Sequence, residues 1–224
     1  MRAMEQEKVA EIIDSVLPGE TVLVKYTTSY IPEFTLKFFI EYSKERGVPL
    51  VIDDNFDTLH AIAIHAKTMG LSLDLDSVYV LKTGGKFDVG NVLAKVPFHP
   101  DPRVYLKNYE ESSIKIFREI PSPMINLVLG LENLFLVTRT PLDTYRIILA
   151  MQRFTGDKRR KAFYLVNEGI MESLPVKSLY ELERISTTVV RLTPYHTGAD
   201  VKVLKTINPS LVGTETTIDA GGWS

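Results

Sequence analysis

The stretch TVLVKYTTSYIPEFTLKFFIEYSKERG, residues 21–47, predicts a strand, a short loop and an amphipathic helix. Three consecutive apolar residues, 22–24, are typical of a strand that is buried on both faces. Large apolar side chains then gather on one side of a helix that we expect to begin at Pro32 and to end at Gly47. In many α/β proteins the loop of such a unit is rich in glycine and holds phosphate, but this loop contains no glycine.

The same unit repeats further along the chain. VPLVIDD predicts a second strand, and NFDTLHAIAIHAKTMG predicts a helix with Asn55 as its N-cap and Gly70 at its end. SVYVLKTGG predicts a third strand, and NVLAKVPF a fourth that pairs with it through a hairpin turn at residues 84–90. This alternation of strands and helices predicts a mostly parallel sheet with right-handed crossovers.

Outside these units the pattern is less regular but still alternates. Helices are expected over residues 5–17, over residues 103–119, after Pro141 and in PVKSLYELERIS. INLVLGLENLF and RKAFYLVNEG predict strands, and TTVVRLTP and ADVKVLKTI predict two closing strands joined by a polar turn. No linker divides the chain, so we expect one domain over residues 1–220 and a flexible tail over residues 221–224.

Composition excludes several classes of protein. The formal charge is −2, from 26 basic and 28 acidic residues, which does not favour binding to nucleic acid or to an anionic membrane. The absence of cysteine excludes disulfides, thiolate catalysis and cysteine-bound zinc. The charged start is unlike a secretory signal, and the apolar runs fall far short of the ~20 residues that span a bilayer, so a cytoplasmic protein is expected. The basic run at residues 158–161 is interpreted as a solvated turn before a strand.

Two features fall where the predicted strands end, the position at which open parallel sheets bind ligands. In the first loop, Thr27, Thr28 and Ser29 either line a pocket or form a polar connection, since an anion nest is hard to build without glycine. Asp53 and Asp54 end the second predicted strand. They either orient a water or a metal ion, or stabilise the start of the next helix as first-turn acids.

Other motifs carry less information about function. The sequence LKTGGKFDVGN does not have the spacing of a phosphate loop, in which Lys-Ser/Thr follows the last glycine. The four histidines do not cluster, and His60 and His65 are five residues apart rather than the four of a zinc-binding helix. There is no Gly-x-Ser-x-Gly elbow. These motifs therefore predict no catalytic residue, metal site or cofactor.

The longer segment LPGETVLVKYTTSYIPEFTLKFFIEYSKERGVPLVIDD resembles the start of a RecA/KaiC-type ATPase core, and RKAFYLVNEG, TTVVRLTP and ADVKVLKTI resemble its last strands. In detail the chain resembles the archaeal domain of unknown function 257, a RecA/KaiC-like core that lacks the phosphate loop. The resemblance implies a three-layer α/β fold of the P-loop NTPase type. Its sheet would be mostly parallel, flanked by helices and closed by antiparallel strands.

Two of the family's nucleotide motifs are degenerate in this sequence. The lysine and hydroxyl of the Walker A motif would fall near residues 31–33, which are Ile, Pro and Glu, and the carboxylate of Glu33 would repel a phosphate. The acid that orients magnesium would end the strand NLVLG, where Gly130 stands. Glu132 follows two residues later, and we expect its side chain to point elsewhere.

Two further motifs are partly kept. The family's catalytic acids match Asp53 and Asp54. Its Lys-x-Arg finger, which reaches into a neighbouring subunit, matches residues 205–207, where Lys205 remains and Ile207 replaces the arginine. Because phosphoryl transfer depends on positioned cations and amides, hydrolysis of ATP or GTP is not expected.

These observations leave two principal hypotheses. The first is a non-catalytic module that binds a protein or peptide, including a second copy of the chain as a homodimer, and needs no cofactor. The second is an enzyme or sensor with an altered phosphate site that uses Lys25 or Lys82 as the cation and Asp53 and Asp54 as metal ligands. Binding of single-stranded nucleic acid would need a basic groove with stacking aromatics, which the sequence does not indicate.

Overall fold

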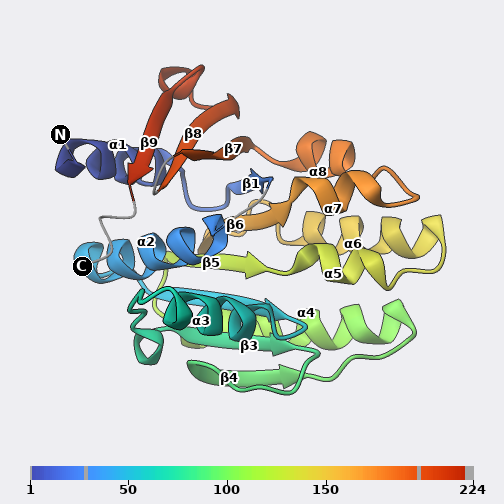
Figure 1. Ribbon diagram of the computed structural model, residues 1–224. Coiled ribbons are helices and arrows are strands. Elements are labelled where there is room, and N and C mark those ends of the chain that lie inside the picture. Colours follow the sequence, from blue (N-terminus) through green and yellow to red (C-terminus); the bar gives the residue numbers. More distant parts are fainter. Residues whose placement is uncertain (1, 28–29, 196–197, 220–224) are drawn as a thin grey trace.

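The computed structural model describes residues 2–27, 30–195 and 198–219. In these ranges nine strands form one sheet in the order β4-β3-β2-β5-β6-β1-β7-β8-β9, from the bottom to the top of Figure 1. The strands are β1 (Thr21–Tyr26), β2 (Leu50–Asn55), β3 (Tyr79–Thr83), β4 (Asn91–Val96), β5 (Met124–Leu129), β6 (Arg160–Asn167), β7 (Thr188–Tyr195), β8 (Gly198–Lys205) and β9 (Glu215–Asp219).

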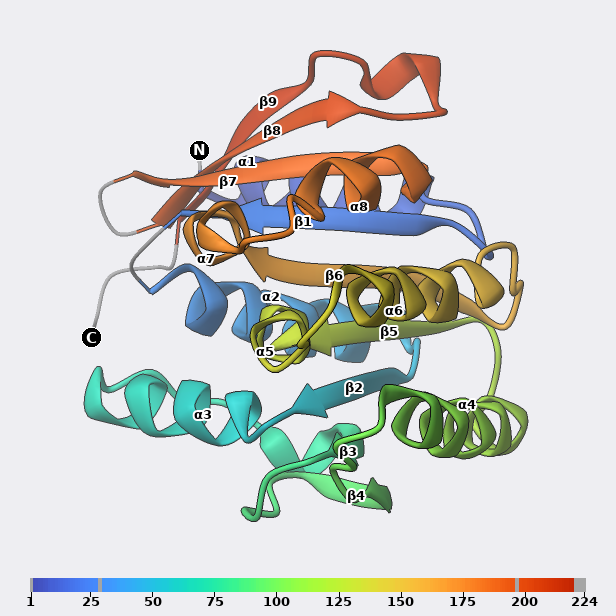
Figure 2. The same ribbon diagram turned by 90° about the vertical axis from the view of Figure 1, so that its right-hand side faces the viewer.

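Helices cover both faces of the sheet. They are α1 (Arg2–Ser15), α2 (Ile31–Arg46), α3 (Thr58–Thr68), α4 (Pro102–Glu119), α5 (Leu131–Leu136), α6 (Pro141–Arg153), α7 (Glu168–Ser173) and α8 (Leu179–Ile185). Helices α1 to α3 pack on one face around a first hydrophobic core, and α4 to α8 pack on the other face around a second (Figures 1 and 2). The expected three layers are therefore confirmed. Among the described residues, no helix combines the length and apolar character needed to span a bilayer.

The sheet is parallel from β4 to β7 and antiparallel from β7 to β9. Strand β1 lies between β6 and β7 and is buried over its first five residues, as its continuous apolar run predicts. The mostly parallel sheet with closing antiparallel strands is confirmed. The sequence did not lead us to expect β9, which pairs with β8 and contacts α1.

The predicted hairpin between the third and fourth strands is wrong, because β4 pairs with β3 in parallel. Residues 84–90 run back beside the sheet, from the amide of Gly84, which donates to Val96 O (2.8 Å), to that of Asn91, which donates to Val78 O (3.0 Å). An extended residue advances about 3.3 Å. The connection of residues 84–90 is therefore long enough to run back along β3, which spans only residues 79–83. The glycine-rich sequence of residues 84–90 is compatible with a hairpin turn and with a short crossover that contains no helix, so it did not distinguish the two.

The predicted N-cap at Asn55 is also wrong. Asn55 is the last residue of β2, and its buried side chain donates to Leu129 O (2.8 Å) and accepts from the hydroxyl of Thr83 (2.7 Å). The residue before α3 is Asp57, whose side chain caps no helix amide. By contrast, the predicted limits of α2 hold, since Pro32 lies in its first turn and Gly47 is its C-cap.

The basic run at residues 158–161 is not wholly solvated, because Arg160 is only 1 % exposed. Its guanidinium lies over the rings of Phe154 (5.0 Å to the centroid) and Phe117 (5.5 Å) and donates to the side chains of Asn126 and Tyr164. A buried arginine needs such partners because its charge cannot be removed. Arg160 therefore joins α4 and α6 to the sheet.

Candidate functional site

The turn from β1 to α2 lies at the carboxyl end of the parallel sheet, where a nucleotide phosphate would be held. Thr27 is half-buried there, and the predicted Thr28 and Ser29 lie outside the described residues. Helix α2 begins with Ile31 and Pro32, both buried, and its N-terminal residue Tyr30 makes no side-chain cap. Proline offers no amide and isoleucine no charge, so these two described residues of the turn offer neither a cation nor a pair of amides to a phosphate.

Glu33 occupies the first turn of α2 and is only 4 % exposed. One carboxylate oxygen lies 3.0 Å from Nδ1 of His65 on α3, while the other is buried without a hydrogen-bond partner. The predicted like charge near a phosphate is therefore present in the fold. Its contact with His65 was not predicted, since the two residues are far apart in sequence and no short motif joins them.

Glu132 was expected to point elsewhere, but its side chain lies close to this turn. It is buried in α5 beside Tyr26, the last residue of β1, and Asn167, the last residue of β6. Burial raises the pKa of Glu132. Burial and then the charge of Glu132 raise the pKa of Tyr26. The side chain of Tyr26 at the end of β1 therefore has the carboxyl groups of Glu132 and Glu33 as neighbours.

Gly130 leaves no room for an acid at the end of β5. Its φ of 69° is left-handed, and an added Cβ would lie 2.1 Å from Oγ1 of Thr58 and 2.6 Å from the backbone oxygen of Asn55. Any side chain here would strain the backbone and collide with α3. The packing around Gly130 therefore excludes an acidic side chain at the position where RecA/KaiC-type ATPases have the acid that orients magnesium.

Asp53 lies inside the layer of α4 and α6. Its carboxylate accepts from the hydroxyl of Tyr109 (2.6 Å) and from the amide of Asn126 (3.2 Å), and Asn126 also binds Arg160. Burial raises the pKa of Asp53 to about 6, against the opposing effects of Tyr109, Arg160 and Asn126. The Asp53 carboxylate has no exposed surface and accepts hydrogen bonds from α4 and β5, so it stabilises their packing. It is not accessible to a metal ion or an attacking water.

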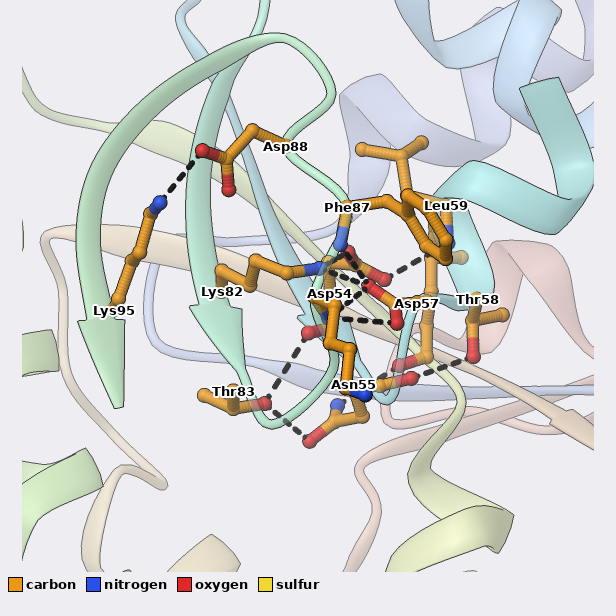
Figure 3. A network of polar contacts seen from close by, with 12 residues as sticks. Asp54, Asn55, Asp57, Thr58, Leu59, Lys82, Thr83, Phe87, Asp88 and Lys95 are labelled. Atoms are coloured by element: carbon orange, nitrogen blue, oxygen red, sulfur yellow. Dashed lines mark hydrogen bonds and ion pairs between the residues drawn. The ribbon is translucent and has the colours of Figure 1, made fainter. Parts of the chain in front are cut away.

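Asp54 points to the opposite face of the sheet and is equally buried. It accepts from the backbone amide of Leu59 in α3 (2.8 Å) and pairs with Lys82 of β3 (3.0 Å), as Figure 3 shows. Lys82 also pairs with Asp57 (2.5 Å). Asp53 and Asp54 are therefore neighbours in sequence whose side chains serve two separate networks.

Lys25, the other proposed cation, is held in a third network beneath α7 and α8. Its ammonium group pairs with Glu168 (2.9 Å) and Glu183 (2.5 Å), and Arg191 also pairs with Glu168 (2.6 Å). With Lys25 only 3 % exposed, no free cation remains on β1. Within the described part of the chain, no three side chains of the metal-binding types come together.

Lys205, the retained residue of the interface finger, lies at the end of β8. It donates to the backbone oxygens of Glu183 (2.7 Å), Arg184 (3.2 Å) and Ser186 (2.7 Å) at the end of α8. Ile207, in place of the finger's arginine, is exposed. The lysine thus has a defined contact within its own chain.

Solved structures with the same fold are found among archaeal proteins. PH0250 from Pyrococcus horikoshii OT3 is 27% identical, with a TM-score of 0.78 over 93% of this chain and 98% of that chain. The KaiC-like protein PH0186 from the same organism is 11% identical, with a TM-score of 0.60 over 88% and 84% of the two chains. The flagellar accessory protein FlaH from Methanocaldococcus jannaschii is 14% identical, with a TM-score of 0.59 over 95% and 89%. The chain therefore has a RecA/KaiC-like fold.

No curated protein matches the chain. The sequence profile of DUF257, described as a Pyrococcus protein of unknown function, matches residues 11–217. That match spans nearly all of the sheet and both helical layers. This chain belongs to the DUF257 family.

Proposed function

We propose that this chain is a non-catalytic interaction module, built on a RecA/KaiC-like core that no longer uses a nucleotide. The proposal rests first on the turn between β1 and α2, where the carboxylate of Glu33 takes the place of a cation. Nearby, Glu132 adds a second buried carboxylate, and Gly130 excludes the acid that would hold magnesium. Among the described residues of this turn, a nucleotide triphosphate would meet the like charge of Glu33 and no cation.

The same contacts weaken the alternative of an altered phosphate site. That hypothesis needs Lys25 or Lys82 as a free cation and Asp53 and Asp54 as free acids. Each of the four is buried and bound to partners in its own chain. Removing Lys82 from its network would leave the buried Asp54 without its cation, which typically costs about 3–5 kcal/mol.

The observation that carries an interaction role is an apolar surface on the outer side of α6. Helix α6 is apolar inward through Ile147 and Ile148, and also outward at positions 142, 145 and 149. It contacts α5 and α8, which add further exposed apolar side chains. We call this set the α6 surface; it consists of Leu136, Val137, Leu142, Tyr145, Leu149 and Tyr180. Exposed apolar side chains on three neighbouring helices favour protein association.

The charges at the rim favour a second copy as the occupant. Arg184 of α8 lies near Tyr145 and pairs with Glu181 (2.8 Å), and Arg153 at the end of α6 pairs with Glu110 (2.5 Å). A twofold interface brings a surface against itself, so a rim that holds both signs of charge is self-complementary. The proposed assembly is a homodimer through the α6 surface.

Light scattering tests this proposal with a pair of variants. The wild-type protein is expected at twice the 25.3 kDa of one chain, and Leu149→Lys is expected to be monomeric. Ile64→Lys is the matched control, because Ile64 of α3 is an apolar residue on the other face of the sheet that is somewhat more exposed than Leu149 (49 % against 38 %). A wild-type monomer at high concentration, or a dimer lost in the Ile64 variant and kept in the Leu149 variant, would contradict the assignment.

A further inference from the structure

The loop after β3 surrounds a carboxylate with donors. The two oxygens of Asp57 accept from the backbone amides of Lys86 (2.9 and 2.8 Å) and Phe87 (2.9 Å) and from the ammonium of Lys82 (2.5 Å), as Figure 3 shows. Successive backbone amides that converge on one anion form a nest, the arrangement that proteins use to capture phosphate or carboxylate groups. Lys82 of β3 is only 3 % exposed, so its ammonium group is held in place beside the Asp57 carboxylate.

The loop is shaped for an anion at close range. Gly84 and Gly85 both have left-handed φ angles, of 71° and 74°. A Cβ on Gly85 would lie 2.3 Å from Oδ1 of Asp57, so only glycine lets the carboxylate reach the amides. The glycine pair therefore builds a receptor rather than the predicted hairpin turn.

The residue that fills this receptor is held in an unfavourable conformation. Phe56 and Asp57 have φ angles of 55° and 62°, and they are the non-glycine residues with positive φ in the described ranges. A bulky residue such as phenylalanine seldom adopts this region, and it persists only where surrounding contacts require it. Release of the Asp57 carboxylate would let both residues return to an ordinary backbone conformation.

Charge balance identifies the ligand that could replace Asp57. Lys82 lies between two carboxylates, with Asp54 at 3.0 Å on its other side. Exchange of the Asp57 carboxylate for another carboxylate keeps one negative charge in the nest. A phosphate dianion would add a second negative charge beside the buried Asp54, which is unfavourable at such a site. The nest is therefore matched to a carboxylate.

The surroundings of the nest match the end of a polypeptide chain. Phe87 is 53 % exposed and stacks on His60 (4.2 Å between centroids), and Phe98 is exposed nearby against Phe56 (5.3 Å). Strand β4 lies at the edge of the described sheet, and its last residue, Val96, binds the amide of Gly84. An open strand edge with aromatic surface and a carboxylate nest is a recurring way to bind an extended peptide terminus.

We propose that the loop of residues 84–87, together with Lys82, is a binding site for the C-terminal carboxylate of a peptide, and that Asp57 closes it in the free chain. The site goes beyond the proposed function and does not depend on the α6 surface, which belongs to other helices. A peptide terminus enters by exchange with the Asp57 carboxylate. Its affinity is lowered by the small fraction of molecules in which the nest is open.

The variant Asp57→Gly tests the site directly, because glycine removes the occupant and tolerates the left-handed backbone. In this variant, N-acetylglycine is expected to shift the amide resonances of Lys86 and Phe87, with a dissociation constant about tenfold below that of the wild type. N-acetylglycinamide and chloride at equal ionic strength are expected to have no effect. Gly85→Ala in the same background is the control, since its Cβ occupies the position of the carboxylate.

Each outcome decides the proposal. No shift in the folded Asp57→Gly variant, or an equal shift with the neutral amide, overturns the site. Equal affinity for acetate and N-acetylglycine overturns the peptide terminus as the ligand. If the wild-type Lys86 and Phe87 resonances do not shift at an N-acetylglycine concentration a hundredfold above the variant's dissociation constant, the proposed exchange with Asp57 is wrong. If Asp57→Gly does not fold, the wild-type protein decides: a shift of the Lys86 and Phe87 amides with N-acetylglycine and none with N-acetylglycinamide supports the site, and no difference between the two compounds overturns it. Failure here leaves the dimer test of the α6 surface unaffected.

Discussion

Asp53 shows how a single buried carboxylate in this chain is committed to packing. It joins β2 to Tyr109 of α4 and, through Asn126, to Arg160 of β6. The sequence predicted Asp53 at the end of the second strand, whereas β2 continues to Asn55. The polar partners of Asp53 lie 56 to 107 residues away along the chain and could not be read from any local pattern. Arg160, which looked like part of a solvated turn, is the residue whose environment sequence reasoning missed most completely.

The raised pKa of Asp53 predicts a pH dependence of stability. Burial moves this pKa from 3.8 to about 6, so between these values the folded chain holds a proton that the unfolded chain has lost. The stabilisation is fully present below pH 3.8 and is lost as the pH rises through 6. Asp53→Asn removes this titration, and its free energy of unfolding relative to wild type is expected to rise by about 2 kcal/mol between pH 4 and 7. Urea denaturation of both proteins at pH 4 and pH 7 measures this change. A difference in unfolding free energy between variant and wild type that is the same at both pH values would contradict the burial of Asp53.

Lys82 offers a second test at the same scale. Lys82→Met leaves the buried Asp54 without its cation, so a loss of about 3–5 kcal/mol in unfolding free energy is expected. Lys95→Met on the neighbouring β4 is the matched control, because its pair with Asp88 is exposed (Figure 3), and such pairs contribute about 0–1 kcal/mol. Equal losses in chemical denaturation of the two variants would show that burial does not set the strength of these pairs.

At the scale of elements, regular periodicity predicted most of the architecture. The helices after Pro32 and Pro141 and the strands around Val128 and Leu165 appear where apolar spacing placed them. The parallel crossover at residues 84–90 could not be predicted, since it contains no helix and its glycines serve the carboxylate of Asp57. A glycine pair followed by lysine and phenylalanine is the one local feature that could have indicated a nest.

Helix α8 ends on the ammonium group of Lys205, which predicts a local effect of its loss. Lys205→Met removes three charge-assisted contacts to the last carbonyls, and a loss of about 1 kcal/mol is expected, with faster hydrogen exchange in α8. Lys202→Met on the same strand is the control, because its pair with Glu215 is exposed. The oligomeric mass is expected to stay the same. A change in mass without faster exchange in α8 would support the finger as an interface residue instead.

At the scale of the whole molecule, the chain has a RecA/KaiC-like sheet in which Asp53, Lys25 and Lys82 are engaged within the chain. The fold followed from the resemblance of strand–loop–helix segments, because those patterns reflect packing that is independent of the ligand. Motif position singled out Asp53, Asp54, Lys25 and Lys205 in the sequence, but each has partners that only the folded chain brings together. Where a nucleotide would sit, the chain instead has Glu33 and the closed packing at Gly130.

The central claim, that this edge no longer binds a nucleotide, is tested most directly by thermal unfolding with ATP and GTP, with and without magnesium. A ligand at a hundredfold its dissociation constant stabilises by about 2.7 kcal/mol, which raises Tm by roughly 5–10 °C in a chain of this length. The account predicts no change in Tm for the wild type. A magnesium-dependent rise of that size, larger still in Glu33→Gln, would contradict it and show that the turn between β1 and α2 holds phosphate.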